Sequence, residues 1–452
     1  MKTISIFLLT FIFGIAMQTK AQESNQKEIA VTVYNSNLGV IKDTRSIKLN
    51  SGVSEISITD VAQFIDPTSV HIKFDGTVLE QNYQYDLVSL NKILQKYIDK
   101  NIQLINENNE LVEGKLISAL GNQIVLEQKE GGLIMLPNTD KYRFNVGSLP
   151  QGLITKPTLV WQLNSNKSGN QDVEISYQTL GMNWHAEYVA VLNNDDTKLD
   201  LNAWVSIENN SGSTYKNAKL KLVAGDVNRV QDTRPMYKGR ELDNIAMSAS
   251  ADQFVEKDFF EYHIYNLQRP TTLAQNETKQ ISLFEAQNVD AVKKYLYNSS
   301  GYNTNGKVNV IVEFQNKEDQ ELGVPMPKGK VRVYKSDGES IEFIGEDLVD
   351  HTPKNETIKL KIGDAFDLVA EETQTDHKQI TNRVYEQTFE VKLKNRKKEK
   401  VEIEVERYLG LNWEILNSSI EYKKKNAQTI TFKVPVISDG ETTLTYKVRY
   451  AN

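Results

Sequence analysis

Residues 181–192, GMNWHAEYVAVL, place a histidine and a glutamate two positions apart, at His185 and Glu187. In a β-strand these side chains would share one face, where they could act as an oriented acid/base pair or bind one metal ion. A zinc site usually needs three protein ligands, and the chain has no HExxH motif. We therefore favour the alternative, in which His185 and Glu187 are polar residues on an open or interdomain sheet face.

A second group of ionisable residues lies in residues 345–368, GEDLVDHTPKNETIKLKIGDAFDL, where Asp350 and His351 precede a proline. The same stretch also holds Glu346, Asp347, Asp364 and Asp367. Two carboxylate-rich turns could bind calcium or supply the acid pair of a glycosidase. Neither turn has the DxDxDG pattern of a calcium loop, and Gly and Asp are also what hairpin turns require. A structural role in turns is the interpretation we prefer.

Tyrosines alternate with polar residues in QNYQYDL and EYHIYNL, which predicts partly exposed faces bearing Tyr83, Tyr85, Tyr262 and Tyr265. Exposed aromatic rows suit sugar rings or peptide partners. The alternative is that these rings fill a sandwich core or join two domains.

Almost the whole chain after Glu28 has the two-residue period of β-strands, as in LDLNAWVSIENNSG and VEIEVERY, with Gly, Asn, Asp or Ser between the runs. Many short strands at close spacing predict a mainly β protein built of sandwiches or barrels. One helix stands out, because apolar residues recur every three or four positions after a capping Ser89, at Leu90, Ile93, Leu94, Tyr97 and Ile98. Four or five short strands follow it, so we expect an inserted short helix plus a small barrel that is SH3-like or Sm-like.

A length of 452 residues predicts several domains. We expect a signal peptide, a first β-sandwich in two pieces, the helix-and-barrel insert, a flexible loop or linker, a middle β domain and a C-terminal Ig-like β-sandwich. Their ranges are 1–21, 22–88 with 151–226, 89–150, 227–257, 258–373 and 374–452.

A short internal repeat links two of these regions. VEISYQTLGMNW ends at Trp184 and VEIEVERYLGLNW ends at Trp413. The match suggests a duplicated sub-motif, which requires similar surroundings for the two tryptophans.

Residues 1–21 are typical of a signal peptide, with Lys2 before an apolar run and Ala21 at the cleavage site. The run is shorter than the about 20 residues of a spanning helix, and no later segment is as long. The chain has no cysteine, which excludes disulfides, thiolate metal sites and a lipobox. We predict an exported protein, periplasmic or secreted, with no membrane span once the signal is removed.

The net charge is −7 and becomes −9 when Lys2 and Lys20 leave with the signal. An acidic protein has no electrostatic basis for general nucleic-acid binding. The chain also has no GxSxG, P-loop or GxGxxG motif, and we expect no cofactor and no metal.

Longer phrases form a more specific pattern, among them VTVYNSNLGVIKDTRSIKLNSGVSEISITDVAQFIDPTSVHI, SYQTLGMNWHAEYVAVL, IENNSGSTYKNAKLKLVAGDVNRV and LGVPMPKGKVRVYKSDG. With them the chain resembles, over residues 31–450, the bacterial family called domain of unknown function 4139. The resemblance implies an exported, β-rich protein and carries no activity or catalytic residues. Some related proteins are called mucoidy inhibitors and contain a coiled coil, which this sequence lacks.

Two functions remain open. The first is a non-enzymatic envelope or periplasmic scaffold that binds a protein or a glycan. The second is a hydrolase of envelope glycan or peptide that uses His185, Glu187, Asp350 and His351. An enzyme requires these groups to converge in one cleft, whereas a scaffold leaves them dispersed.

Overall fold

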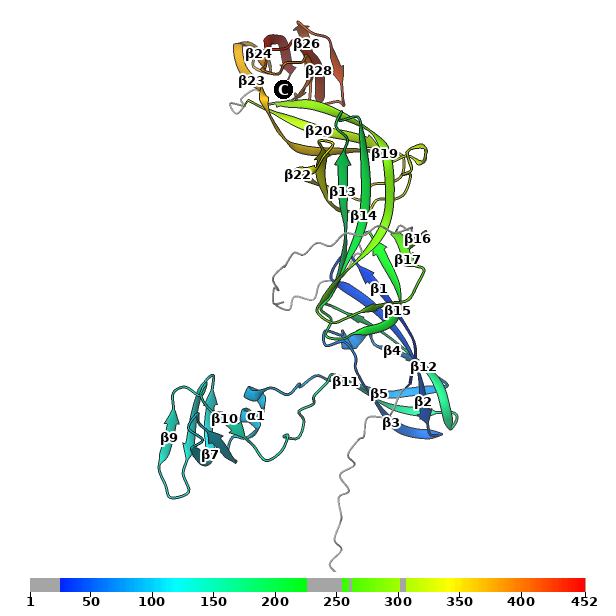
Figure 1. Cartoon of the computed structure of the whole chain (residues 1–452), viewed down its shortest axis with the longest axis vertical. Coiled ribbons are helices and arrows are strands. Elements are labelled where there is room, and N and C mark those ends of the chain that lie inside the picture. The colour runs from blue at the N-terminus through cyan, green and yellow to red at the C-terminus, as the bar shows by residue number, and fades with distance from the viewer. Residues whose placement is uncertain (1–24, 226–253, 260–261, 301–305, 452) are drawn as a thin grey trace, which may run out of the picture.

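The computed structural model describes residues 25–225, 254–259, 262–300 and 306–451. In this part of the chain there are four β-sheets and one α-helix, so the predicted mainly β, multi-sheet sandwich class is confirmed. Figure 1 shows an elongated molecule with the C-terminal sandwich at one end, the first sandwich toward the other, and the insert projecting to one side.

The first sandwich pairs a large sheet with a small one. The large sheet has the order β16 (Phe254–Phe259), β17 (Tyr262–Leu267), β15 (Tyr215–Ala224), β1 (Asn25–Tyr34), β2 (Leu38–Leu49), β12 (Gly169–Thr179), β4 (His71–Lys73), with β18 (Thr271–Leu273) beside β15. The small sheet has the order β3 (Gly52–Thr59), β11 (Thr158–Ser165), β5 (Gly76–Gln84). Alternate residues of β2 are buried, as a half-buried strand requires.

The first sandwich continues into a sheet of thirteen strands, and we call the two together the trunk. The main path of this sheet is β22 (Ile341–Val349), β21 (Gly329–Ser336), β13 (Met182–Leu192), β14 (Lys198–Asn209), β19 (Glu277–Ser299), β20 (Lys307–Gln315), β23 (Thr357–Thr381), β24 (Val384–Asn395), β29 (Gly440–Ala451), β26 (Trp413–Ser418). In the C-terminal part, β25 (Val401–Tyr408), β28 (Thr429–Val436) and β27 (Tyr422–Lys424) form a second layer with the end of β19. Two short 3₁₀ helices, Pro67–Ser69 and Glu318–Gln320, lie in connections.

Two long strands join the middle of the trunk to the C-terminal sandwich. Strand β19 has 23 residues and pairs first with β14 and then with β25. Strand β23 has 25 residues and pairs first with β20 and then with β24. The border expected between residues 373 and 374 therefore lies inside β23. Bending the trunk there requires breaking ladder hydrogen bonds, so we expect a stiff connection.

Three hydrophobic cores fill the described structure. The largest runs from the first sandwich into the middle of the trunk and contains both Trp161 and Val333. The second lies between the layers of the C-terminal sandwich, with Phe389, Phe432 and Tyr446 among its rings. The third belongs to the insert alone.

The insert consists of α1 (Leu90–Lys96) and a five-stranded sheet in the order β10 (Arg143–Asn145), β6 (Asn101–Ile105), β7 (Leu111–Leu120), β8 (Gln123–Glu127), β9 (Leu133–Leu136). Ser89 caps the helix as predicted, accepting a hydrogen bond from the N–H of Lys92 at 3.4 Å. Among the described strands β9 and β10 do not pair with each other, so the sheet is open where the sequence predicts a closed barrel. The core of seven buried residues, which includes Leu94 and Tyr97, is small enough to be covered by one bent sheet and one helix.

Two chain segments connect the insert to the first sandwich, and we call them the neck (residues 85–88 and 152–154). They touch through a single bridge between Leu87 and Ile154. The N–H of Val88 donates to the carbonyl of Ile154 at 2.9 Å, and the N–H of Ile154 donates to that of Asp86 at 3.1 Å. The neck is thus ordered but narrow.

Two of the expected segments fall largely or wholly outside the described residues. The signal peptide, 1–21, lies outside them. Of the predicted loop 227–257, only the last part is described, and there Phe254 begins strand β16. The sequence had no clear strand period there, but β16 pairs along its whole length with β17.

The internal repeat that ends in Trp184 and Trp413 is a shared turn with unlike surroundings. Gly181 and Gly410 both have positive φ, of 82° and 79°, before the next strand begins. Trp184 is fully buried and donates to the carbonyl of Val223, whereas Trp413 is half-buried under the ammonium group of Lys424. The hypothesis of a duplicated sub-motif at this position is wrong.

A closer repeat involves two buried asparagines, each at the end of a strand. Asn209 ends β14 and Asn395 ends β24, and both are nearly inaccessible to solvent. Each side-chain Oδ1 accepts the N–H two residues on, and each Nδ2 donates to the carbonyl four residues on and to two carbonyls of a distant segment. In both places the side chain closes a chain crossing, from β14 of the thirteen-stranded sheet to β15 of the first sandwich, and from β24 to β25 between the layers of the C-terminal sandwich. It does so because it satisfies buried backbone groups that no strand can pair.

Candidate functional site

His185 and Glu187 lie on β13, which is a strand as predicted. Its residues alternate between fully buried and half-buried along the whole strand. Trp184, Ala186 and Tyr188 face the core, and His185 and Glu187 face the other way. The pair therefore lies on the outer face of the sheet, between β21 on one side and β14 on the other.

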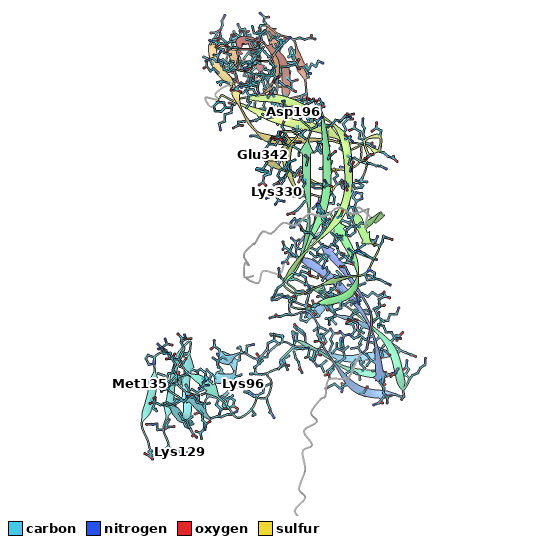
Figure 2. The ribbon with its side chains drawn as sticks, viewed as in Figure 1. Lys96, Lys129, Met135, Asp196, Lys330 and Glu342 are labelled. Atoms are coloured by element: carbon cyan, nitrogen blue, oxygen red, sulfur yellow. The ribbon has the colours of Figure 1, made fainter. Side chains whose placement is uncertain are left out.

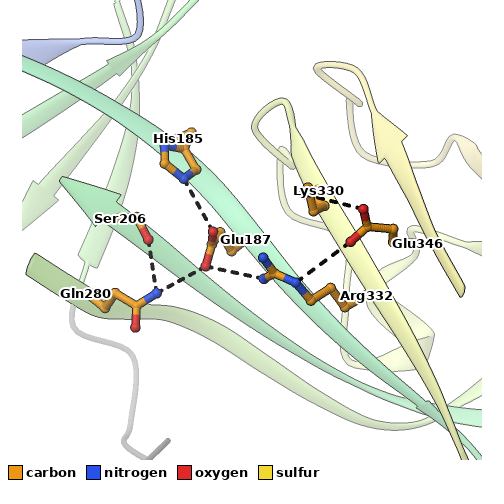
Figure 3. A network of polar contacts seen from close by, with 7 residues as sticks. All are labelled: His185, Glu187, Ser206, Gln280, Lys330, Arg332 and Glu346. Carbon is orange, nitrogen blue, oxygen red and sulfur yellow. Dashed lines mark hydrogen bonds and ion pairs between the residues drawn. The ribbon is translucent and has the colours of Figure 1, made fainter. Parts of the chain in front are cut away.

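Glu187 is the centre of a polar network that crosses several strands (Figure 3). Its carboxylate lies 3.4 Å from Nε2 of His185 and 3.6 Å from Nη1 of Arg332, and accepts a hydrogen bond from Gln280 at 3.1 Å. Gln280 also donates to the hydroxyl of the buried Ser206 at 3.1 Å. Arg332 continues the network to Glu346, which Lys330 also approaches at 3.5 Å.

The charges of the network explain how its acid and its imidazole titrate. The hydrogen bond from His185 and the nearby Arg332 hold the pKa of Glu187 below its usual value, although partial burial opposes this. The same contact with Glu187 raises the pKa of His185. A general base for neutral pH needs a raised carboxylate pKa, so this arrangement favours an ion pair over proton transfer.

Asp350 and His351 follow β22 and do not join that network. Asp350 is strongly exposed and lies 3.4 Å from the ammonium group of Lys328. The His351 ring accepts the N–H of Lys328 at 3.2 Å and lies 3.3 Å from the amide of Asn35, in the turn between β1 and β2. Asp350 nevertheless lies only two strands away from His185, because Ala186 pairs with Gly329 on β21 and Gly329 pairs with Val349 on β22. Between Asp350 and the His185–Glu187 pair lies Lys328, whose ammonium group Asp350 contacts.

Of the other carboxylates in residues 345–368, those of Glu346, Asp347 and Asp364 are also engaged by protein groups. Asp347 accepts the N–H of Lys361 at 2.7 Å. Asp364 accepts hydrogen bonds from Lys307 and Asn309, and the Lys307 contact lowers its pKa. Within the part of the chain that is described, no three His, Asp or Glu side chains gather as metal ligands.

Tyr262 and Tyr265, the second pair of the predicted binding set, differ in burial. Tyr265 is only 4% exposed, lies edge-on to the Trp184 ring at 6.1 Å and donates to the carbonyl of Pro325 at 2.8 Å. Tyr262 is half-buried, with its ring against Gly225. Tyr265 is therefore a core residue. It alternates with less buried neighbours because its side of β17 packs against the core.

Tyr83 and Tyr85 lie at the exit from β5 into the neck and are partly accessible. Their rings stack at 5.6 Å between centroids, with 24° between the planes. The Tyr83 hydroxyl donates to the carbonyl of Gln63 at 3.0 Å, and burial raises its pKa to about 12, so it stays a neutral donor. Tyr85 is 70% exposed. They line an open hollow of about 620 Å³ together with Gln84, Asp86, Gly152, Leu153 and Ile154.

Sequence reasoning missed the partners of the His185–Glu187 pair. Gln280 and Arg332 lie far along the chain from Glu187, and they reach it only because β19 and β21 flank the β13–β14 hairpin. The alternation in each strand places these side chains on a face, but no local pattern reveals which strands are neighbours.

The sequence matches no protein-family model and no curated protein. Membership of the family that its phrases resemble therefore stays a prediction. Over the described residues, no helix combines the length and apolar character needed to cross a membrane.

Proposed function

We propose that this chain is an exported, non-enzymatic binding protein of the bacterial cell envelope whose partner is a protein or a glycan. The observation that carries the proposal is that each candidate catalytic group is held by its own protein partners. Glu187 is held by His185, Gln280 and Arg332 on an outer sheet face, while Asp350 and His351 contact Lys328 and Asn35. A hydrolase needs such groups to converge on one substrate.

The architecture also supports a binding role. The trunk is continuous through β19 and β23, and the insert projects from it on the neck. The insert carries strongly exposed apolar side chains, with Leu120 and Met135 both more than 70% exposed. Met135 lies on the side of the insert away from the trunk, and Lys96 lies toward the neck (Figure 2). Exposed apolar residues on a projecting unit suit contact with a partner.

The first test is a pull-down with residues 22–452 from the envelope fraction of the source cells, with bound proteins and glycans identified by mass spectrometry. We expect one partner to be retained by the wild type and weakened by the double change Leu120→Lys and Met135→Lys or by Tyr85→Ala. The matched control is Tyr408→Ala, another strongly exposed tyrosine, on β25. Release of glycan or peptide fragments that stops in His185→Ala would instead establish the hydrolase.

A further inference from the structure

The hollow at the neck has the composition of a small binding site. Its wall combines the rings of Tyr83 and Tyr85 and the aliphatic side chains of Leu153 and Ile154 with the polar Gln84 and Asp86. A volume of about 620 Å³ lies within the usual range for small-molecule sites. Such sites are mostly apolar, with a few polar groups that orient the ligand.

The aromatic part of the wall is fixed in place before any ligand arrives. Tyr83 is half-buried and tied to the carbonyl of Gln63, and the Tyr85 ring stacks on it. Tyr85 therefore has one face against Tyr83 while the side chain remains largely accessible. An aromatic ring with two rotatable bonds, already held by a neighbour, loses little conformational entropy on binding.

The polar part of the wall limits the chemistry of the ligand. Asp86 is about half-exposed and lies 2.7 Å from the ammonium group of Lys92, on the helix of the insert. Its carboxylate can accept hydrogen bonds from hydroxyl groups, while its ion pair with Lys92 balances its charge. A pyranose ring with equatorial substituents offers a flat C–H face to an aromatic ring and hydroxyls around its edge, which matches this wall.

We propose that the hollow binds a neutral pyranose ring of an envelope glycan, stacked on Tyr85, with Asp86 and Gln84 accepting or donating hydrogen bonds at its edge. The proposal rests on the binding function proposed above and specifies the partner class. The hollow lies at the neck, and Asp86 in its wall pairs with Lys92 of the insert. A bound sugar would therefore contact the two segments that connect the insert to the first sandwich.

Isothermal titration of residues 22–452 with the β-1,4-linked tetramers of N-acetylglucosamine and of glucose tests the proposal. We expect at least one tetramer to bind with a dissociation constant below about 10 mM, in the weak range typical of small ligands. Tyr85→Ala should weaken it about three- to tenfold, the usual worth of an aromatic contact. Tyr85→Phe should bind like the wild type because it keeps the ring.

Tyr408→Ala, on the C-terminal sandwich, is the control for a general loss of exposed tyrosine and should leave binding unchanged. Binding of neither neutral tetramer, or equal binding by Tyr85→Ala and the wild type in a protein with unchanged thermal unfolding, overturns the sugar site. A protein partner retained in the pull-down by Tyr85→Ala would then leave the broader binding function standing.

Discussion

The first and the C-terminal sandwiches each bury an ion pair near tyrosines, but they build it differently. In the first sandwich, Asp43 and Arg45 lie two positions apart on β2, and the carboxylate accepts from Nε of Arg45 at 2.7 Å and from Gln26 at 3.1 Å. Tyr177 and Tyr215 lie nearby on strands of the same sheet. The pair and its tyrosines thus belong to one layer.

In the C-terminal sandwich the pair crosses from one layer to the other. Glu372 on β23 lies 3.7 Å from Arg407 on β25, and both side chains are almost fully buried. The Glu372 carboxylate also accepts from Ser299 at 2.5 Å and from Tyr297 at 3.2 Å, both on β19. The Arg407 guanidinium lies over the Phe389 ring at 4.5 Å, and its Nε and Nη1 atoms make no hydrogen bond.

The difference indicates what each pair can do for its sandwich. A pair within one strand has its geometry set by that strand and stabilises no particular layer arrangement. A pair that crosses the core holds two layers in one register. Its guanidinium, however, has buried N–H groups without hydrogen-bond partners, which lowers the stability gained. Burial raises the pKa of Tyr446, beside Ser299, so this ring also stays neutral next to the pair.

The largest expected effect comes from breaking the cross-layer pair. Glu372→Ala leaves Arg407 buried without a counter-charge, and we expect the free energy of unfolding to fall by about 3–5 kcal/mol, measured by urea denaturation. The control is Glu371→Ala, an exposed neighbour paired with Lys394, which should cause no measurable change.

Replacing both members, Glu372→Leu with Arg407→Met, tests whether the sandwich needs the two charges or only a filled core. We expect the double variant to recover part of the loss, because no buried charge is left unpaired, although the hydroxyls of Ser299 and Tyr297 still lose their acceptor. A double variant as unstable as Glu372→Ala would mean that the charges themselves hold the layers together.

The two buried asparagines, Asn209 where the chain enters the first sandwich and Asn395 in the C-terminal sandwich, should stabilise the protein by equal amounts. Asn209→Ala and Asn395→Ala each leave three carbonyls and one N–H without their side-chain partner, and each should cost about 2–3 kcal/mol of unfolding free energy. Urea denaturation of the two variants side by side measures this. Costs that differ by more than about 1 kcal/mol would show that the matching hydrogen bonds are not energetically equivalent.

A smaller effect is expected for the pair within β2. Asp43→Asn keeps an oxygen that can accept from Arg45 and removes only the charge, so we expect a loss of about 1–2 kcal/mol in the same assay. Asp172→Asn, an exposed carboxylate paired with Lys27, is the matched control and should be silent. A loss equal to that of Glu372→Ala would contradict the distinction between the two pairs.

The half-buried pair of His185 and Glu187 should give the smallest change in stability, and it serves as a reference for the two fully buried pairs. The pKa of His185 is raised, so its stabilisation is fully present below the unfolded value of about 6.5 and is lost as the pH rises through the folded value. The pKa of Glu187 is lowered, so its share is lost as the pH falls through its folded value. The pair should therefore stabilise most at mildly acidic pH.

Nuclear magnetic resonance titration should place the His185 pKa above its ordinary value, and Glu187→Gln should lower it. Because the imidazole is 40% exposed, solvent screening limits the contribution to a few tenths of a kcal/mol. An unchanged His185 pKa in Glu187→Gln would exclude the pair as its cause.

Much of the local structure follows from the sequence, and some side-chain roles do as well. The alternation in residues 182–192 correctly separates Trp184 from His185, and Ser89 caps the only α-helix in the described part of the chain. The alternation in β2 and β25 could likewise have revealed that Asp43, Arg45 and Arg407 are buried, since each lies on the apolar face of its strand. By contrast, nothing local distinguished the buried Tyr265 from the exposed Tyr85.

The sequence by itself determined the strand period, the helix and its cap, and the faces on which His185, Glu187, Asp43 and Arg407 lie, because residues two to four positions apart encode these features. Only the tertiary structure decided that Glu187 meets Gln280 and Arg332, that Glu372 meets Arg407, that β19 and β23 join the middle of the trunk to the C-terminal sandwich, and that the insert sheet stays open. These pairings join strands far apart in the chain, and their choice depends on how complete sheets bury their apolar faces against one another.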